Sequence, residues 1–163
     1  MKLVPVLRRD KSVRTWTAVS DEDFVAASAT PWYLHSGGYV TRDGSTVLLH
    51  RQIAGINNPA VKVDHVNGDR LDNQRTNLRV STTSQNGQNR HELNANNASG
   101  YRGVHWLARE RKWRAVGTLE YKRVCVGYYD DPAVAAAALA AWRAEHMPFS
   151  QEAAQLKETA CWS

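Results

Sequence analysis

The sequence predicts an α+β protein made of two small modules. A chain of 163 residues is long enough for one large domain or two small ones. All ten asparagines fall between Asn57 and Asn97, which separates an Asn-free front, an Asn-rich middle and an Asn-free back. The back contains three aromatic and β-branched strand candidates followed by an alanine-rich helix candidate. Separate runs of strands and helices are typical of α+β folds.

The front is expected to hold two short strands and a short helix. Residues 32–34 and 38–42 are strand candidates around a Ser-Gly-Gly turn, and the Asp-Gly pair at 43–44 offers another hairpin turn. From 46 to 56 the apolar residues have loosely helical spacing, and the Asn-Asn-Pro sequence at 57–59 would end a helix.

The middle predicts a β-β-α unit. Residues 61–63 alternate as in a strand, a loop follows, and 78–80 alternate again. Thr82 and Gln85 have capping-box spacing, which predicts a helix over about 84–90.

The back predicts a three-stranded meander packed on a helix. The strand candidates are 101–106, 113–118 and 123–128. The alanine-rich stretch 133–146 should form the helix, with an aspartate cap and proline in its first turn. The polar stretch 91–99 is the natural boundary between modules. Within the tail, 147–163, only a short helical turn around 152–156 is expected, with no chemistry assigned.

Charge, cysteine content and the absence of long apolar runs limit the classes of protein that this sequence fits. The net charge of +5 and pI of about 9.4 would attract a polyanion, which alone is weak evidence for nucleic-acid binding. Cys125 and Cys161 form no CxxC pair, which argues against a disulfide framework or a zinc knuckle. The first residues contain no apolar stretch typical of a signal peptide, and no run approaches membrane-spanning length. We therefore expect a cytoplasmic protein.

Four polar residues have an informative spacing. Asp64 and His65 are adjacent at the end of a strand candidate, and such a pair alone is more often a capped loop than a site. Asn77 follows His65 by twelve residues, and Asn86 follows Asn77 by nine. Strand, loop, strand and helix would bring all four side chains to one end of a hairpin.

The segment VDHVNGDRLDNQRTNLRVSTTSQNGQNR, residues 63–90, resembles the HNH homing endonucleases of phages and introns, in the His-Asn-Asn subgroup. The upstream Leu49-His50-Arg51 also resembles that family's helix before the motif. The resemblance implies a ββα-metal (His-Me finger) nuclease module that cuts double-stranded DNA.

Carried over to this chain, the resemblance implies a role for each of the four residues. Asp64 and Asn86 would bind Mg²⁺ or Mn²⁺ through oxygen, and no zinc is expected. Neutral His65 would accept the proton of the attacking water, while the cation stabilises the leaving oxygen. Asn77 would organise the loop through its amide.

Several nearby residues allow two interpretations. Asn86 has the alternative of satisfying local backbone groups, and Asn89 one turn later is a rival ligand. His50 and Arg51 are candidates for phosphate contact or for packing. Arg90 is a further, secondary candidate for the site.

Two acids in the loop, Asp69 and Asp72, suggest a second metal site. Their sequences, Asn-Gly-Asp and Leu-Asp-Asn, are also ordinary turn sequences. We favour the turn interpretation.

A basic stretch follows the β-β-α unit. Between 102 and 123, seven lysines and arginines outnumber two glutamates, which gives a local charge of +5. Trp106 and Trp113 are interleaved with these cations, so one sheet face would offer guanidinium groups to bases while the indoles pack on sugars. The equally weighted alternative is that both tryptophans are core residues and the charges form a solvated face.

The segments SGYRGVHW, KWRA and VGYYDDPAVAAAALAAW, within 98–146, resemble the DNA-binding domain of plant ethylene-response factors, the AP-two class. The resemblance implies a three-stranded antiparallel sheet packed on one Ala-rich helix. This chain departs from the plant pattern in its short charged turn at 107–112. The expected DNA contacts are Arg102, Trp106, Arg109, Arg111, Arg114 and Arg123.

Together these features predict a nuclease module at 1–92 (core 61–90), a linker at 93–98, a DNA-binding domain at 99–146 and a tail at 147–163. We expect a monomer or weak dimer acting on duplex DNA in the bacterial host cytoplasm of a phage. The alternatives are a non-catalytic DNA-binding regulator and an RNA-binding or structural adaptor, which would not explain the spacing of the four polar residues.

Overall fold

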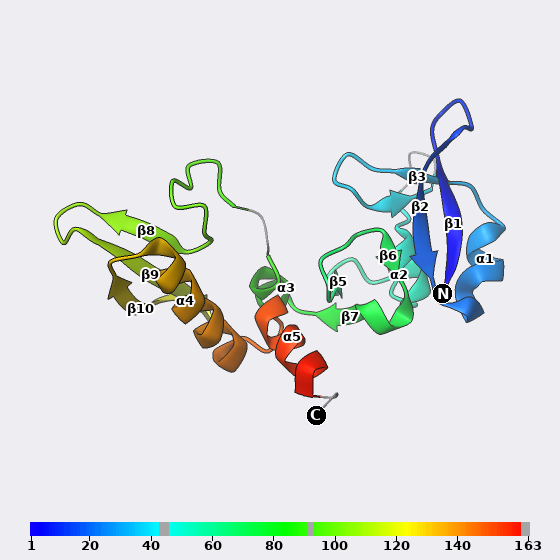
Figure 1. Cartoon of the computed structure of the whole chain (residues 1–163). Helices are drawn as coiled ribbons and strands as arrows, with labels where there is room; N and C mark the ends of the chain where they lie inside the picture. The colour runs from blue at the N-terminus through cyan, green and yellow to red at the C-terminus, as the bar shows by residue number, and fades with distance from the viewer. Residues whose placement is uncertain (43–45, 91–92, 161–163) are drawn as a thin grey trace. The chain divides into compact units, whose positions relative to one another are not determined.

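The computed structural model describes residues 1–42, 46–90 and 93–160. It contains two compact units, Met1–Thr83 and Ser84–Ser163, and each is a mixture of strands and helices (Figure 1). The expected α+β class is confirmed. The hairpin turn expected at 43–44 and part of the expected boundary at 91–99 lie outside the described residues. The nuclease module expected at 1–92 and the DNA-binding domain expected at 99–146 stay predictions, because the division into compact units does not show what each unit does.

The first unit contains a five-stranded sheet in the order β4-β3-β1-β2-β6. β1 (Lys2–Leu7) and β2 (Val13–Val19) form an antiparallel hairpin, which the sequence analysis missed. β3 (Trp32–Leu34) runs parallel to β1 and pairs antiparallel with β4 (Val40–Thr41), which confirms the two strands expected there. β6 (Asp72–Asn73) joins the far edge, parallel to β2.

Short helices close the core of this unit. A 3₁₀ turn (Asp21–Asp23) leads into α1 (Phe24–Ser28), and α2 (Leu49–Ile53) is shorter than the helix expected over 46–56. Trp32 is fully buried, and its indole Nε1 donates to the Ala27 carbonyl at 2.8 Å, which ties the sheet to α1. The other buried apolar residues of this core are Val4, Val6, Val19, Ala27, Val40, Leu49 and Ile53.

A second, two-stranded sheet carries the candidate motif. β5 (Lys62–His65) pairs antiparallel with β7 (Leu78–Ser81). A long loop containing β6 and the 3₁₀ turn Arg75–Asn77 connects them, and α3 (Thr83–Gln88) follows β7. The expected order of strand, loop, strand and helix is observed, and all of α3 after Thr83 belongs to the second unit.

The second unit contains an antiparallel sheet in the order β10-β9-β8, made by β8 (Val104–Leu107), β9 (Lys112–Leu119) and β10 (Lys122–Tyr129). α4 (Pro132–His146) lies along this sheet in Figure 1. The buried residues between them are Val104, Ala115, Ala135 and Leu139.

The N-terminus of α4 is capped in the way that its sequence predicts. The Asp131 carboxylate accepts from the backbone N–H groups of Ala133 and Val134, and Pro132 occupies the first turn. Beyond α4, α5 (Gln151–Ala160) is a longer helix than the turn expected at 152–156. No helix among the described residues is long and apolar enough to cross a membrane.

Candidate functional site

β5 places Asp64 and His65 in a buried position. Their residues are 8% and 4% exposed, and β7 aligns Arg79 opposite Asp64. Arg79 Nη2 and Nε lie 2.8 and 3.1 Å from Asp64 Oδ2, so the guanidinium compensates the buried carboxylate. The adjacent acid and imidazole therefore have distinct surroundings.

A chain of buried hydrogen bonds orients the His65 ring. The Thr17 hydroxyl donates to the Leu71 carbonyl at 2.6 Å, so Thr17 Oγ1 must accept from Asn73 Nδ2, 2.7 Å away. This turns Asn73 Oδ1 toward His65 Nε2, at 3.2 Å. Nε2 of a neutral ring then carries the hydrogen, and the ring lone pair lies on Nδ1.

Sequence reasoning missed Thr17 and Asn73. The pair is assembled by the parallel pairing of β6 with β2, where Asn73 aligns with Val19. Thr17 is 0% exposed and Asn73 1%. The available signal is the Leu-Asp-Asn sequence, which is also typical of a turn, and the sequence pattern does not predict β2.

Three rings pack together beside the site. The His50 and His65 centroids are 5.1 Å apart, and Tyr39 lies 5.3 Å from His50. Burial, with the neighbouring His65, lowers the pKa of His50 to about 3. Burial also lowers the pKa of His65, although the hydrogen bond to Asn73 opposes this. At neutral pH both rings are uncharged, as a general base requires.

Asn77 joins the two ends of the loop. Its Oδ1 accepts from the Asn67 backbone N–H at 2.9 Å, and its Nδ2 donates to the Asp72 carbonyl at 2.7 Å. Asp69 and Asp72 each accept a backbone N–H group two residues ahead. Asp69 begins a turn, as expected, whereas Asp72 is the first residue of strand β6, so the turn expected at Leu-Asp-Asn is wrong.

The remaining candidates around the motif belong to different units. Buried His50 packs on His65, and Arg51 donates to the carbonyls of Val61 and Asn58 at 2.7 and 2.6 Å, contacts that hold the approach to β5. Exposed Asn86 on α3 lies in the second unit, as do Asn89 and Arg90. The first unit by itself thus brings together Asp64, His65 and Asn77.

The donor chemistry suits a hard divalent cation. Among the described residues, no three His, Cys, Asp or Glu side chains are arranged so that they could hold a metal ion. A magnesium ion keeps several waters and uses one or two protein carboxylates with substrate phosphate oxygens. Within the first unit, the carboxylate of Asp64 is a ligand of that kind.

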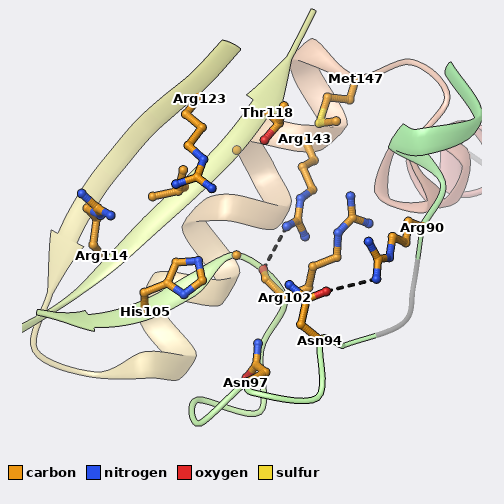
Figure 2. Close-up of a pocket in the computed structure, with 13 residues that line it drawn as sticks. Arg90, Asn94, Asn97, Arg102, His105, Arg114, Thr118, Arg123, Arg143 and Met147 are labelled. Carbon is orange, nitrogen blue, oxygen red and sulfur yellow. Dashed lines mark hydrogen bonds between the residues drawn. The ribbon is translucent and has the colours of Figure 1, made fainter. Parts of the chain in front are cut away.

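The sheet of the second unit has two chemically different faces. Cross-strand pairs His105–Arg114 and Thr118–Arg123 share the face away from α4 (Figure 2). Trp106 pairs with Trp113, at a ring distance of 5.2 Å, on the face that packs against α4. Trp106 is 48% exposed, so it lies at the end of that face and opposite the arginines.

The other expected DNA contacts lie at the edge and in the turn. Arg102 precedes β8 and is half-buried. Arg109 and Arg111 lie in the exposed turn between β8 and β9, where Arg111 has a positive φ of 51°. The Arg109 side chain is 94% exposed, with Glu110 3.9 Å away. Arg102, Arg114 and Arg123 are therefore grouped, whereas the turn arginines project into solvent.

Comparison with known families gives one finding. Residues 47–88 match the family model described as HNH endonuclease, a stretch that includes α2, β5, β7 and α3 but less than half of the chain. No curated protein and no solved structure matches the chain. The matched stretch contains Asp64, His65, Asn77 and Asn86, and it supports an HNH nuclease.

Proposed function

We propose that this protein is a metal-dependent DNA endonuclease of the HNH type, with His65 as its general base. The observation that carries the proposal is the buried imidazole of His65, which lies next to Asp64 and has its Nε2 3.2 Å from Asn73 Oδ1. These residues lie within the stretch that matches the HNH endonuclease model.

His65 Nδ1 accepts a proton from the water that attacks the phosphodiester. The hydrogen bond from Nε2 to Asn73 keeps the lone pair on Nδ1 and stabilises the ring when it becomes charged. Asp64 and Asn86 would hold Mg²⁺ or Mn²⁺, which supplies positive charge to the phosphate and the leaving oxygen. Asn77 keeps the loop closed around this arrangement.

The second unit holds the duplex. The guanidinium groups of Arg102, Arg114 and Arg123 beside the sheet contact phosphates and base edges, as in the AP-two domains that this part of the chain resembles. A nuclease hairpin alone neutralises few phosphates, so a separate basic surface raises its affinity. We place the protein among phage-type homing or nicking endonucleases.

Supercoiled plasmid incubated with the purified protein and Mg²⁺ or Mn²⁺ tests the activity. We expect nicked or linear product from wild type, and losses of at least ~100-fold in His65→Ala and Asp64→Ala. His35→Ala removes an exposed histidine of the same unit and should cut like wild type. Circular dichroism checks that each variant is folded.

Equal cutting by all four proteins would contradict the mechanism. DNA binding without cutting by the wild type, with either metal, would instead indicate a non-catalytic regulator.

A further inference from the structure

A basic pocket opens in the second unit beside the start of β8. Its volume is about 220 Å³, and Figure 2 shows side chains from β8, β9, β10, α4 and the segment before β8 around it. Asn94, Asn97 and Thr118 add polar groups to its wall. The arginines that line it are Arg90, Arg102, Arg114, Arg123 and Arg143.

The positive charge in this pocket is only partly compensated, because Glu152 lies near Arg143 and Arg102 but five arginines line the pocket. None of the described residues that line it is acidic. Glu152 contacts Arg143 Nη1 at 3.1 Å but is not part of the lining. Burial, followed by the nearby charge of Arg143, lowers the pKa of Arg102 to about 10. Half-buried cations so close together are stabilised by a bound anion.

One donor in the pocket has no partner of its own. Arg114 Nε is buried and makes no hydrogen bond within the described part of the chain. A buried donor without a hydrogen-bond partner is destabilising, so such an atom indicates an absent partner. Arg114 lines the pocket and belongs to the face of the sheet away from α4.

The arrangement is rigid on its helical side. Arg143 is 7% exposed, and its Nη2 donates to the Arg102 carbonyl at 2.9 Å. Gly103, with φ +80°, permits this approach, because a Cβ there would lie 3.0 Å from Arg143 Nη2. The cations are thus held in place by the fold, as a preorganised anion site requires.

We propose that this pocket binds a phosphate group of the DNA backbone through Arg102, Arg114 and Arg143. Planar guanidinium groups match the oxygens of a phosphate, and Arg143 adds fixed positive charge behind the two more accessible arginines. The His105–Arg114 and Thr118–Arg123 pairs continue the basic surface from the pocket across the sheet. The inference rests on the proposed DNA-binding role, and it makes the pocket the anchor of that surface.

Fluorescence anisotropy of a labelled DNA duplex tests the proposal with the full chain. The assay contains EDTA, so it reads binding without cleavage. We expect Arg102→Gln and Arg114→Gln each to weaken binding about tenfold and to lower the slope of log K against log salt by about 1. Arg9→Gln removes the same charge from an exposed turn of the first unit and should change binding less than twofold. Thermal unfolding verifies that all variants are folded.

The source of the phosphate is tested separately with inorganic phosphate. NMR signals of the arginine Nε–H groups, with Arg114 assigned from Arg114→Gln, should shift when duplex is added. A shift with inorganic phosphate, combined with unchanged DNA binding in both variants, would overturn the proposal in favour of a free phosphorylated ligand. DNA affinities equal to that of Arg9→Gln would also overturn it.

This result is independent of the nuclease assay. If wild type cuts no DNA but the two pocket variants bind it weakly, the pocket proposal stands and the proposed activity fails. If cutting is confirmed and the pocket variants bind normally, the pocket proposal alone fails.

Discussion

The polar site around His65 and the basic pocket around Arg102 and Arg114 differ in how their hydrogen-bonding groups are satisfied. Around His65, buried polar groups find partners within the chain: Thr17, Asn73 and Arg79 each complete a hydrogen bond or ion pair. Around Arg102 and Arg114, cations line an open pocket and one buried donor has no partner among the described residues. The first arrangement fixes one proton position, and the second retains binding capacity for an external anion.

The difference follows from the task of each region. A general base must present one lone pair in one direction, so the protein gains by satisfying every other group around it. A phosphate site must keep donors available, which leaves charge and hydrogen-bonding capacity uncompensated until the ligand arrives. Substitutions in one region should therefore affect proton chemistry, and those in the other should affect packing or DNA affinity.

The largest effect is expected at the glycine that shapes the basic pocket. In Gly103→Ala, the new Cβ would lie 2.6 Å from the Val116 carbonyl oxygen and 2.8 Å from Leu139 Cδ2, at a φ of +80°. Left-handed backbone strain and overpacking together should cost about 3 kcal/mol in the free energy of unfolding, measured by urea titration. Gly100→Ala is the control, since its φ is +75° and nothing lies within 4 Å.

Gly100→Ala should therefore lose only about 1 kcal/mol, from backbone strain. Equal losses in the two variants would show that close packing at Gly103 does not shape the pocket.

The sequence predicted elements whose signals are local. The β5–β7 hairpin follows from alternation, the three strands of the second unit follow from their aromatic and β-branched residues, and α4 follows from its alanines and an aspartate cap, which the structure places at Asp131. Asp64 and His65 are candidate site residues because they are adjacent in the sequence, and Asn77 is one because of its spacing from His65.

Local sequence patterns do not predict which strands pair when they are far apart in the chain. Thr17 and Asn73 are 56 residues apart, and only the parallel pairing of β6 with β2 brings them together. The face of Trp106 likewise depends on the register of β8 with β9, which no local pattern specifies. The cavity beside β8 requires the segment from Arg90, the sheet and α4 at once.

A smaller effect is expected from acid on the first unit. The pKa of His50 is about 3 in the folded protein, below its ordinary value of 6.5, because burial disfavours the charged ring. The unfolded chain therefore binds a proton first, and stability that is complete above pH 6.5 is lost as the pH falls toward 3. At pH 5 this should cost about 2 kcal/mol relative to pH 7.5.

Urea unfolding at the two pH values measures this loss. His50→Gln should reduce it by most of that amount, whereas exposed His35→Gln should leave it unchanged. The same acid loss in wild type and His50→Gln would show that His50 is not the group responsible.

The smallest predicted change is the most specific to the His65 network. In Thr17→Val, Asn73 Nδ2 loses the shorter of its two hydrogen bonds and keeps only the bond to the Arg70 carbonyl at 3.2 Å, so the Asn73 amide rotates more easily and presents Nδ2 to His65 in part of the molecules. His65 Nε2 must then accept, which moves the ring hydrogen to Nδ1 and occupies the basic atom. One neutral hydrogen bond is worth about 1 kcal/mol, so we expect a loss of about fivefold in the single-turnover cleavage rate. Thr17→Ser keeps the hydroxyl and should cut at nearly the wild-type rate.

Nitrogen-15 NMR of the histidine rings distinguishes this mechanism from a general loss of structure. The His65 signals, assigned from His65→Ala, should report hydrogen on Nε2 in wild type and Thr17→Ser, and a mixture of tautomers in Thr17→Val. A slower Thr17→Val enzyme with an unchanged tautomer would reject the positioning role of Thr17 and Asn73. The cleavage rate would then depend on packing at Thr17, and the contrast between the two regions would lose its chemical basis.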